Sequence, residues 1–324
     1  MKLSIIIPAH NPGRFLRETL DSCLCQQGIN LEIVVVNDGS TDGTADYLAG
    51  LGSPVRVLSF PAGHGSGAFA RNAGLEACSG DAVKFLDHDD VLVEGALEKE
   101  MGALEKTGAD LVMSSWGVCE MDSDGVVDES TRVVHHPPAP DRLVDAILGE
   151  GKTPFTAAVL YRKDLIRDLR WDANVALYDD FDFFCRAALA AGKVAVAPGP
   201  SYWWRRHKGS FQARVAVDAR SYYLAERTRS TICRKIEPAL AARPDFTPAR
   251  RRRLAAAYYK GLRAFARWDP AFCADILGRI EGLVPGFRPN ATEEPVRVIR
   301  VLMRVLGVSP ALAIYRNLRR CFRE

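Results

Sequence analysis

The chain has 324 residues, of which 48% are hydrophobic and 26% charged, and its formal net charge is +3. This is the composition of an ordinary globular protein, long enough for one large domain or two smaller ones. No apolar run approaches the ~20 residues of a membrane-spanning helix, and the run at residues 3–9 is too short for a signal peptide.

Short β-branched runs alternate with amphipathic stretches through the first third of the chain. They predict strands at residues 4–7, 33–36, 55–60, 83–86 and 111–114, and helices at about 12–26, 43–50, 67–78 and 94–107. The alternation predicts an α/β fold with a Rossmann-like, mostly parallel sheet and helices on both faces. In such a sheet ligands bind beyond the carboxyl ends of the strands, so we expect the polar segments there to converge.

The second half of the chain is less regular. We expect strands at 157–161 and 193–197, a helix near the start of "YDDFDFFCRAALAAG", and a loop over "YWWRRHKGS" at 202–210. After about residue 215 the chain is Arg/Ala-rich and helical in pattern. We therefore divide it into an α/β domain at 1–212 and a basic, mainly helical region at 213–324.

Charge and cysteine content suggest where the protein works. Residues 1–200 carry 17 Lys+Arg against 30 Asp+Glu, whereas residues 201–324 carry 26 against 10. The basic part is therefore a candidate for contact with an anionic surface. The eight cysteines are scattered and form no CxxC pair, which argues against a disulfide framework or a zinc site and favours a reducing cytoplasm.

The segment "VKFLDHDD" places three carboxylates at the end of a predicted buried strand. Asp87 and Asp89 are two positions apart, so on an extended backbone both carboxylates face the same side. A divalent cation there would cancel their repulsion. Hard oxygen ligands suit Mg²⁺ or Mn²⁺. Two other interpretations remain open. One is a solvated loop in which Asp90 caps the next helix. The other is a phosphatase of the haloacid dehalogenase type with Asp87 as its nucleophile.

Three segments in order support the cation interpretation. "SIIIPAHNPGRFLRETLDSCLCQQ", "LEIVVVNDGSTDGT" and "ARNAGLEACSGDAVKFLDHDD" resemble the family 2 glycosyltransferases, which have the GT-A fold, in both motif and spacing. The resemblance is strong over residues 3–95, weaker to about 210, and absent from the C-terminal third. It implies nucleotide-sugar binding. The sequence departs from the family at His10, where an aromatic residue is frequent, and this puts base stacking in doubt.

The resemblance implies a role for particular residues in binding the nucleotide. The predicted nucleotide-binding residues are Pro8, Ala9, Asn11, Asp38, Arg71, Asp87 and His88. Asp38 is a carboxylate that would accept a hydrogen bond from a pyrimidine imide, although a simple Asx turn explains it about equally well. Arg71 offers a forked donor for phosphate or for the acidic cluster, and its alternative is a solvated helix arginine.

The segment "YDDFDFFCRAALAAG" matches the family's acidic pair. By position Asp179 and Asp180 are that pair, followed by Asp182 and Arg186, and the resemblance makes Asp180 the general base of an inverting transfer. Without the upstream motifs, acidic residues that favour a helix N-terminus would be the simpler explanation.

The segment "YWWRRHKGS" resembles a family loop near the diphosphate. Arg205, Arg206, His207 and Lys208 are candidates to hold phosphate oxygens, and His207 is a candidate third metal ligand beside Asp87 and Asp89. An exposed basic loop packed through Trp203 and Trp204 is an equal alternative, and those two rings are also candidates to stack on an acceptor sugar.

The basic tail contains one amphipathic segment, "PVRVIRVLMRVLG". Its arginines fall on one helical face and its apolar residues on the other. Such a helix either lies on an anionic membrane or packs on its own domain. We expect a cytoplasmic protein, with peripheral binding to the inner face of the membrane as a hypothesis. Nothing resembles a nucleic-acid reader.

Together these features predict a metal-dependent, inverting glycosyltransferase of the hexosyltransferase type. Its donor would be a nucleotide-sugar, with UDP-sugar favoured and dTDP- and GDP-sugars open. Its acceptor would be a hydroxyl on a saccharide or lipid-linked saccharide, in cell-surface polysaccharide synthesis. The alternatives are the phosphatase and a non-catalytic, membrane-associated scaffold that binds sugar nucleotides.

Overall fold

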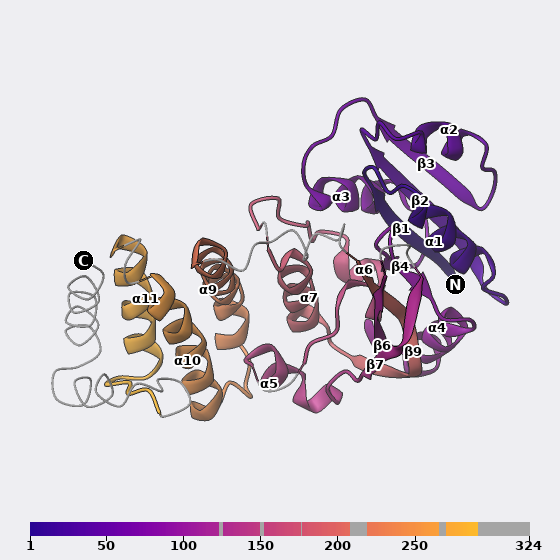
Figure 1. Ribbon diagram of the computed structural model, residues 1–324. Helices are drawn as coiled ribbons and strands as arrows, with labels where there is room; N and C mark the ends of the chain where they lie inside the picture. Colours follow the sequence, from indigo (N-terminus) through magenta and orange to yellow (C-terminus); the bar gives the residue numbers. More distant parts are fainter. Residues whose placement is uncertain (123–125, 150–151, 176, 208–218, 266–269, 291–324) are drawn as a thin grey trace. The chain divides into compact units, whose positions relative to one another are not determined.

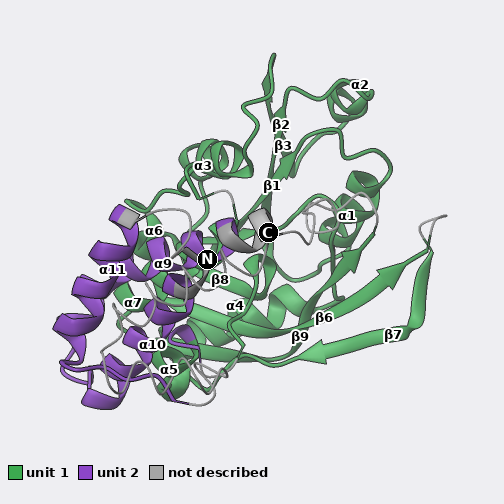
Figure 2. Cartoon of the chain, turned by 60° about the vertical axis from the view of Figure 1, so that its left-hand side comes forward, with its two compact units in different colours: residues 1–146, 151–215 green, residues 147–150, 216–324 purple. Residues whose placement is uncertain are grey.

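A curled, mixed sheet forms the centre of the first part of the chain (Figure 1). The computed structural model describes residues 1–122, 126–149, 152–175, 177–207, 219–265 and 270–290. Two compact units are distinguished, residues 1–146 with 151–215 and residues 147–150 with 216–324 (Figure 2). The domain boundary predicted at 212/213 lies outside the described residues.

The first half of the sheet is parallel. β1 (Lys2–Ala9) pairs with β2 (Asn30–Asp38) and β4 (Ala82–Phe85), and β2 also pairs with β3 (Val55–Phe60), giving the order β3-β2-β1-β4. All four strands were predicted from the sequence and are confirmed. Their carboxyl ends lie at one edge, as crossover connections between parallel strands require.

The second half of the sheet is mainly antiparallel. β8 (Val159–Arg162) runs antiparallel to both β4 and β6 (Leu111–Met121), and β7 (Val127–His135) is antiparallel to β6. β9 (Val194–Arg206) runs parallel to β6 and pairs antiparallel with the short β5 (Val91–Leu92). The fold is α/β, as predicted.

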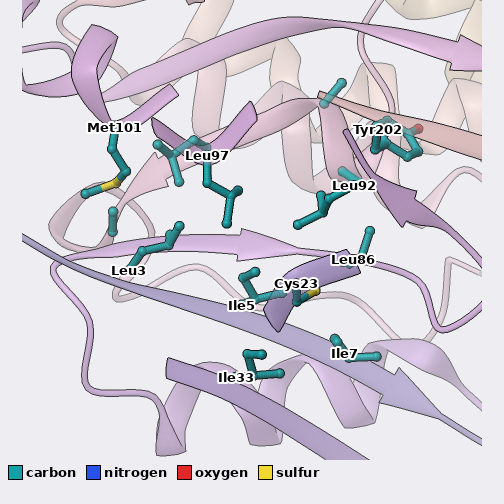
Figure 3. Packing of buried hydrophobic residues seen from close by; sticks show 14 of the residues in the cluster. Leu3, Ile5, Ile7, Cys23, Ile33, Leu86, Leu92, Leu97, Met101 and Tyr202 are labelled. Atoms are coloured by element: carbon teal, nitrogen blue, oxygen red, sulfur yellow. The ribbon is translucent and has the colours of Figure 1, made fainter. Parts of the chain in front are cut away.

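Helices cover both faces of the parallel strands. They are α1 (Phe15–Leu24), α2 (Thr44–Ala49), α3 (Gly67–Ala77) and α4 (Ala96–Thr107), all near the predicted spans. One face of β1 packs with α1 and α4 in the core drawn in Figure 3, which includes Leu3, Ile5, Ile7, Cys23, Leu97 and Met101. On the other face α3 approaches closely at Gly74, where an added Cβ would lie 2.4 Å from Ile6.

The segment predicted as a loop at 202–210 was assigned wrongly in its first half. β9 continues to Arg206, so Trp203, Trp204, Arg205 and Arg206 are strand residues. The sequence Pro198-Gly199-Pro200 indicates a break, but the sheet absorbs it through register shifts between β6 and β9. The remaining elements of this unit are two short 3-10 helices, Pro140–Arg142 and Thr156–Ala158, and the helices α5 (Leu143–Ile147), α6 (Lys163–Ile166) and α7 (Asp179–Ala190).

The second unit is helical in its described part. α9 (Ala219–Ala241), α10 (Pro248–Phe265) and α11 (Pro270–Leu283) pack together around buried apolar residues such as Ile236, Tyr258 and Ile276. No helix in the described ranges is long and apolar enough to cross a membrane. The basic amphipathic helix predicted around residues 297–306 lies outside the described residues.

Candidate active site

The loops that follow β1, β2 and β4 are joined at the carboxyl edge of the sheet. The side chain of Asn11, after β1, accepts a hydrogen bond from the backbone N–H of Thr41, after β2, at 2.7 Å. His88, after β4, contacts the carbonyl of Pro8 through its Nδ1 at 3.1 Å. The strand-end segments therefore converge, as their order in the sequence predicts. Ala9 is buried in β1, whereas Asn11 is exposed and adopts a φ of 48°.

Asp38 is buried at the end of β2 and is bound by a residue that sequence reasoning missed. Its Oδ2 accepts from the backbone N–H of His64 at 3.0 Å and its Oδ1 lies 2.6 Å from His64 Nδ1. The Asx turn proposed for Asp38 is wrong, since it is Asn37 whose side chain accepts from the Ser40 N–H. The available signal was a lone histidine between glycines, "GHGSG", in the loop that follows the strand predicted at 55–60.

Arg71 joins three separate elements at the centre of the site. From α3 its Nη2 donates to Asp87 at 2.7 Å and its Nη1 donates to Asp179 at 3.0 Å. The guanidinium carbon lies 4.5 Å from the ring centroid of Trp171, a second residue that was not predicted. Burial on its own would lower the pKa of Arg71, but the two carboxylates outweigh it and raise the pKa. Arg71 is therefore charged and is no solvated helix arginine.

Asp180 sits beside this ion-pair cluster, in the first turn of α7. Its side chain is half-buried, and Phe181 N–H donates to its Oδ1 at 2.8 Å. Burial, followed by the charge of neighbouring Asp179, raises the pKa of Asp180 to about 7. Asp182, predicted to follow the acidic pair, is instead fully buried and bonded to Arg186 at 2.6 Å. Asp180 is thus a carboxylate whose ionisation falls near neutral pH.

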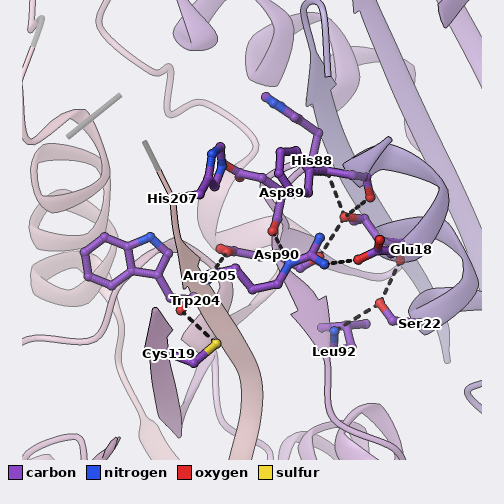
Figure 4. Close-up of polar contacts among 12 residues, drawn as sticks. Glu18, Ser22, His88, Asp89, Asp90, Leu92, Cys119, Trp204, Arg205 and His207 are labelled. Carbon is purple, nitrogen blue, oxygen red and sulfur yellow. Dashed lines mark hydrogen bonds and ion pairs between the residues drawn. The ribbon is translucent and has the colours of Figure 1, made fainter. Parts of the chain in front are cut away.

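Asp89 belongs to a second cluster, where the loop after β4 meets the end of β9 (Figure 4). Its Oδ2 lies 3.1 Å from His207 Nε2, and the His207 ring centroid lies 4.4 Å from that of Phe15. Burial alone would raise the pKa of Asp89, but the hydrogen bond to His207 and nearby positive charge outweigh it, so the pKa is lowered. The surroundings of Asp89 therefore favour its ionised form.

Asp90 does not cap the following helix, so that alternative is wrong. α4 begins at Ala96 with Gly95 at its N-cap, while Asp90 is buried and accepts from the Arg205 backbone N–H at 3.0 Å. Burial raises the pKa of Asp90 well above its ordinary value, and the charges of Asp89 and Asp87 add to this. Asp90 is a structural residue that attaches the acidic segment to β9.

The basic and aromatic residues of β9 are also engaged within the protein. Arg205 is buried, forms an ion pair with Glu18 and donates through Nε to the Asp89 carbonyl, which leaves its Nη2 without a partner among the described residues. Arg206 pairs with Glu120 at 2.8 Å on the surface.

The two tryptophans of β9 are partly buried. The ring of Trp203 lies directly over Gly117, and its centroid is 4.5 Å from the Arg132 guanidinium carbon. The ring of Trp204 packs against Phe155 at 5.2 Å. Neither tryptophan lies in an exposed loop.

The residues present fit a cation that is shared with a substrate. Within the described ranges no group of three or more His, Cys, Asp or Glu side chains is arranged to hold a metal ion. Asp89 and His207 nevertheless offer one carboxylate and one imidazole side by side. Mg²⁺ and Mn²⁺ are commonly held by one or two protein ligands plus substrate phosphates, so two such ligands suffice.

Comparison with known proteins gives a family match. Residues 4–170 match the sequence model described as Glycosyl transferase family 2. The succinoglycan biosynthesis protein ExoO of Rhizobium meliloti is 25% identical over 223 residues, which are 67% of this chain and 64% of that protein. Glycosyltransferase GlyG of Streptococcus pneumoniae is 27% identical over 221 residues, covering 64% of this chain and 72% of GlyG. The chain thus spans slightly less than two thirds of ExoO.

Solved structures agree in fold. S. aureus TarS 1-349 in complex with UDP-GlcNAc superposes with a TM-score of 0.65 at 17% identity, over 99% of this chain and 92% of that chain. Mannosyltransferase PcManGT from Pyrobaculum calidifontis, in complex with GDP-Man and Mn²⁺, superposes with a TM-score of 0.51 at 19% identity, over 97% of this chain and 86% of that chain. At these identities the likeness shows the fold alone, which is GT-A.

Proposed function

The chain belongs to glycosyl transferase family 2, and on that premise we propose that it transfers a sugar from a nucleotide-sugar to an acceptor hydroxyl with inversion at the anomeric carbon. UDP-sugar is the favoured donor, supported by the UDP-GlcNAc named for the TarS neighbour. The acceptor is a saccharide or lipid-linked saccharide. The named role of ExoO in succinoglycan biosynthesis supports a place in polysaccharide synthesis.

The observation that carries this proposal is the environment of Asp180. A general base works best when its pKa lies near the operating pH, and burial beside Asp179 raises the pKa of Asp180 to about 7. Its ionised carboxylate takes the proton of the acceptor hydroxyl while that oxygen bonds to the anomeric carbon. The bond from the anomeric carbon to the diphosphate breaks, and its electron pair leaves with the diphosphate.

The Arg71 cluster and the Asp89–His207 cluster have separate roles, in positioning the carboxylates and in holding a cation. Arg71 holds Asp87 and Asp179 in fixed positions and offsets their repulsion next to the base. Asp89 and His207 are the residues that would hold Mn²⁺ or Mg²⁺, which when bound stabilises the negative charge of the leaving diphosphate. The Mn²⁺ named with the PcManGT neighbour supports a cation here. Membrane association through the basic C-terminal residues stays part of the proposal.

The test is turnover of a sugar-nucleotide panel by the wild type and by Asp180→Asn. We expect Asp180→Asn to lower kcat by about 10²–10⁴-fold with little change in donor affinity, because the base is lost and the donor site is not. In the wild type kcat/KM should rise about tenfold per pH unit up to about pH 7, since only the ionised carboxylate accepts a proton. The kcat/KM of Asp180→Asn should not show this rise with pH.

Asp168→Asn is the matched control, since it makes the same change at an exposed carboxylate outside the motifs. Wild-type turnover by Asp180→Asn would overturn the assignment of the base. Donor binding without turnover in the wild type would favour the scaffold. Phosphate release from simple esters, abolished by Asp87→Asn, would favour the phosphatase.

A further inference from the structure

The loop between β3 and α3 carries His64 to the end of β2. Gly39 has a φ of +68°, and a Cβ added to it would lie 2.2 Å from the Gly63 nitrogen. Only glycine allows the two backbones to come this close. The approach places the backbone N–H and the imidazole of His64 on the two carboxylate oxygens of Asp38.

Asp38 fixes the tautomer of His64. An ionised carboxylate can only accept, so at 2.6 Å from Asp38 Oδ1 the imidazole Nδ1 must carry the proton. In a neutral ring Nε2 is then an acceptor. The ring is also held in orientation, because it stacks on Phe69 with centroids 3.5 Å apart and planes 15° apart. The edge of Phe60 packs nearby at 5.6 Å.

The accessible group of this pair is the imidazole and not the carboxylate. The Asp38 side chain is 7% exposed and both of its oxygens already accept from His64, whereas the His64 side chain is 41% exposed. His64 Nε2 has no hydrogen-bond partner in the part of the chain that the structure describes. The exposed and oriented acceptor beside the end of β2 is therefore Nε2 of His64.

We infer that His64 Nε2 selects the nucleobase of the donor by accepting the N–H that lies between two exocyclic groups of the base, with Asp38 as its positioning residue. Uracil and thymine offer such an N–H at N3, and guanine offers one at N1. Cytosine presents a lone pair at the same place, which would face the lone pair of Nε2. The inference rests on the proposed function and replaces the direct contact to Asp38 that the sequence suggested.

The experiment measures the affinities of UDP, CDP and N3-methyl-UDP by calorimetry with Mg²⁺ at about pH 8, where imidazoles are generally neutral. We expect the wild type to bind UDP at least about tenfold more tightly than CDP or N3-methyl-UDP, the size of one well-placed hydrogen bond. His64→Phe retains a ring against Phe69 but removes the acceptor. It should lose about tenfold in UDP affinity and bring the UDP/CDP ratio close to one.

CDP affinity is the internal control for folding, because His64→Phe should leave it unchanged or improve it. His64→Leu is the second variant, should the larger ring disturb the loop, and it should give the same loss of discrimination because leucine has no acceptor. In the wild type, the Nε2 signal of ¹⁵N-labelled His64, assigned by its absence in these variants, should shift with UDP and not with CDP.

Each remaining result has a defined meaning. If both variants kept the wild-type ratio of UDP to CDP affinity, the inference would be overturned and another group would recognise the base. Equal binding of UDP and N3-methyl-UDP by the wild type would also overturn it. Turnover with a CDP-sugar would overturn it and leave the proposed function standing. A wild type that binds none of the nucleotides and turns over no nucleotide-sugar would instead overturn the proposed function.

Discussion

Asp87 and Asp89, two carboxylates with one residue between them, lie in different surroundings. Asp87 is held by Arg71, which also binds Asp179 at the start of α7, and this group lies beside the proposed base. Asp89 lies against His207 at the end of β9. The acidic segment therefore serves two clusters, one built on a buried arginine and one on an imidazole. Two carboxylates of one motif, with only His88 between them, acquire separate tasks because different distant elements face them.

Arg71→Ala should break the first cluster and cause the largest loss of stability among these variants. It leaves the carboxylates of Asp87, Asp179 and Asp180 together with no compensating charge. Removal of one partner from a fully buried ion pair costs about 3–5 kcal/mol. Because the Asp87 and Asp179 side chains are 37% and 29% exposed, we expect a smaller loss, but still unfolding at clearly lower urea concentration at neutral pH. Adding Asp87→Asn and Asp179→Asn to this variant should recover part of the loss, since the repulsion is then removed.

Arg167→Ala serves as the control for that measurement. Its ion pair with Asp164 is exposed, and exposed pairs contribute less than about 1 kcal/mol. Equal urea midpoints for Arg71→Ala and Arg167→Ala would show that the central cluster carries no special stabilisation.

Asp89→Asn and His207→Gln should break the second cluster with an intermediate effect. Each is expected to weaken Mn²⁺ binding in the presence of UDP by about 10–100-fold, because each removes or disturbs one of two protein ligands. Asp87→Asn should affect Mn²⁺ less, since its carboxylate is bound to Arg71. Titration followed by Mn²⁺ EPR measures all three. Equal effects of Asp87→Asn and Asp89→Asn would merge the two clusters into one metal site.

Asp90→Asn should give the smallest effect and should be stabilising. Burial raises the pKa of Asp90, so its folded form keeps a proton that the unfolded chain releases, and stability falls as pH rises above the ordinary carboxyl range. An asparagine removes this loss, and its amide oxygen still accepts from the Arg205 N–H. We expect the free energy of unfolding of Asp90→Asn to exceed that of the wild type by about 1 kcal/mol at neutral pH and to equal it at acidic pH. Urea titrations of both proteins at the two pH values measure this difference. Destabilisation at neutral pH would contradict the prediction.

Local pattern was enough for much of the fold and for the chemistry of the acidic segments. Continuous apolar runs mark β1, β2 and β4 because strands covered on both faces must be apolar throughout. The end of β9 was missed because Pro and Gly signal a break locally, while pairing with β6 holds the strand together through its register shifts.

The partners of the site residues were beyond the reach of the sequence alone. Order and spacing predicted that polar strand ends would converge, since crossover connections bring parallel strands to a common edge. Which side chain meets which depends on contacts across 26 residues for Asp38 and His64, 108 for Arg71 and Asp179, and 118 for Asp89 and His207. Such contacts leave no local periodicity, and they set the ionisation of each carboxylate. The sequence by itself determined that the carboxylates gather at one edge, and only the tertiary structure decided which faces an arginine, which an imidazole, and which is buried, because burial and neighbouring charge act through space.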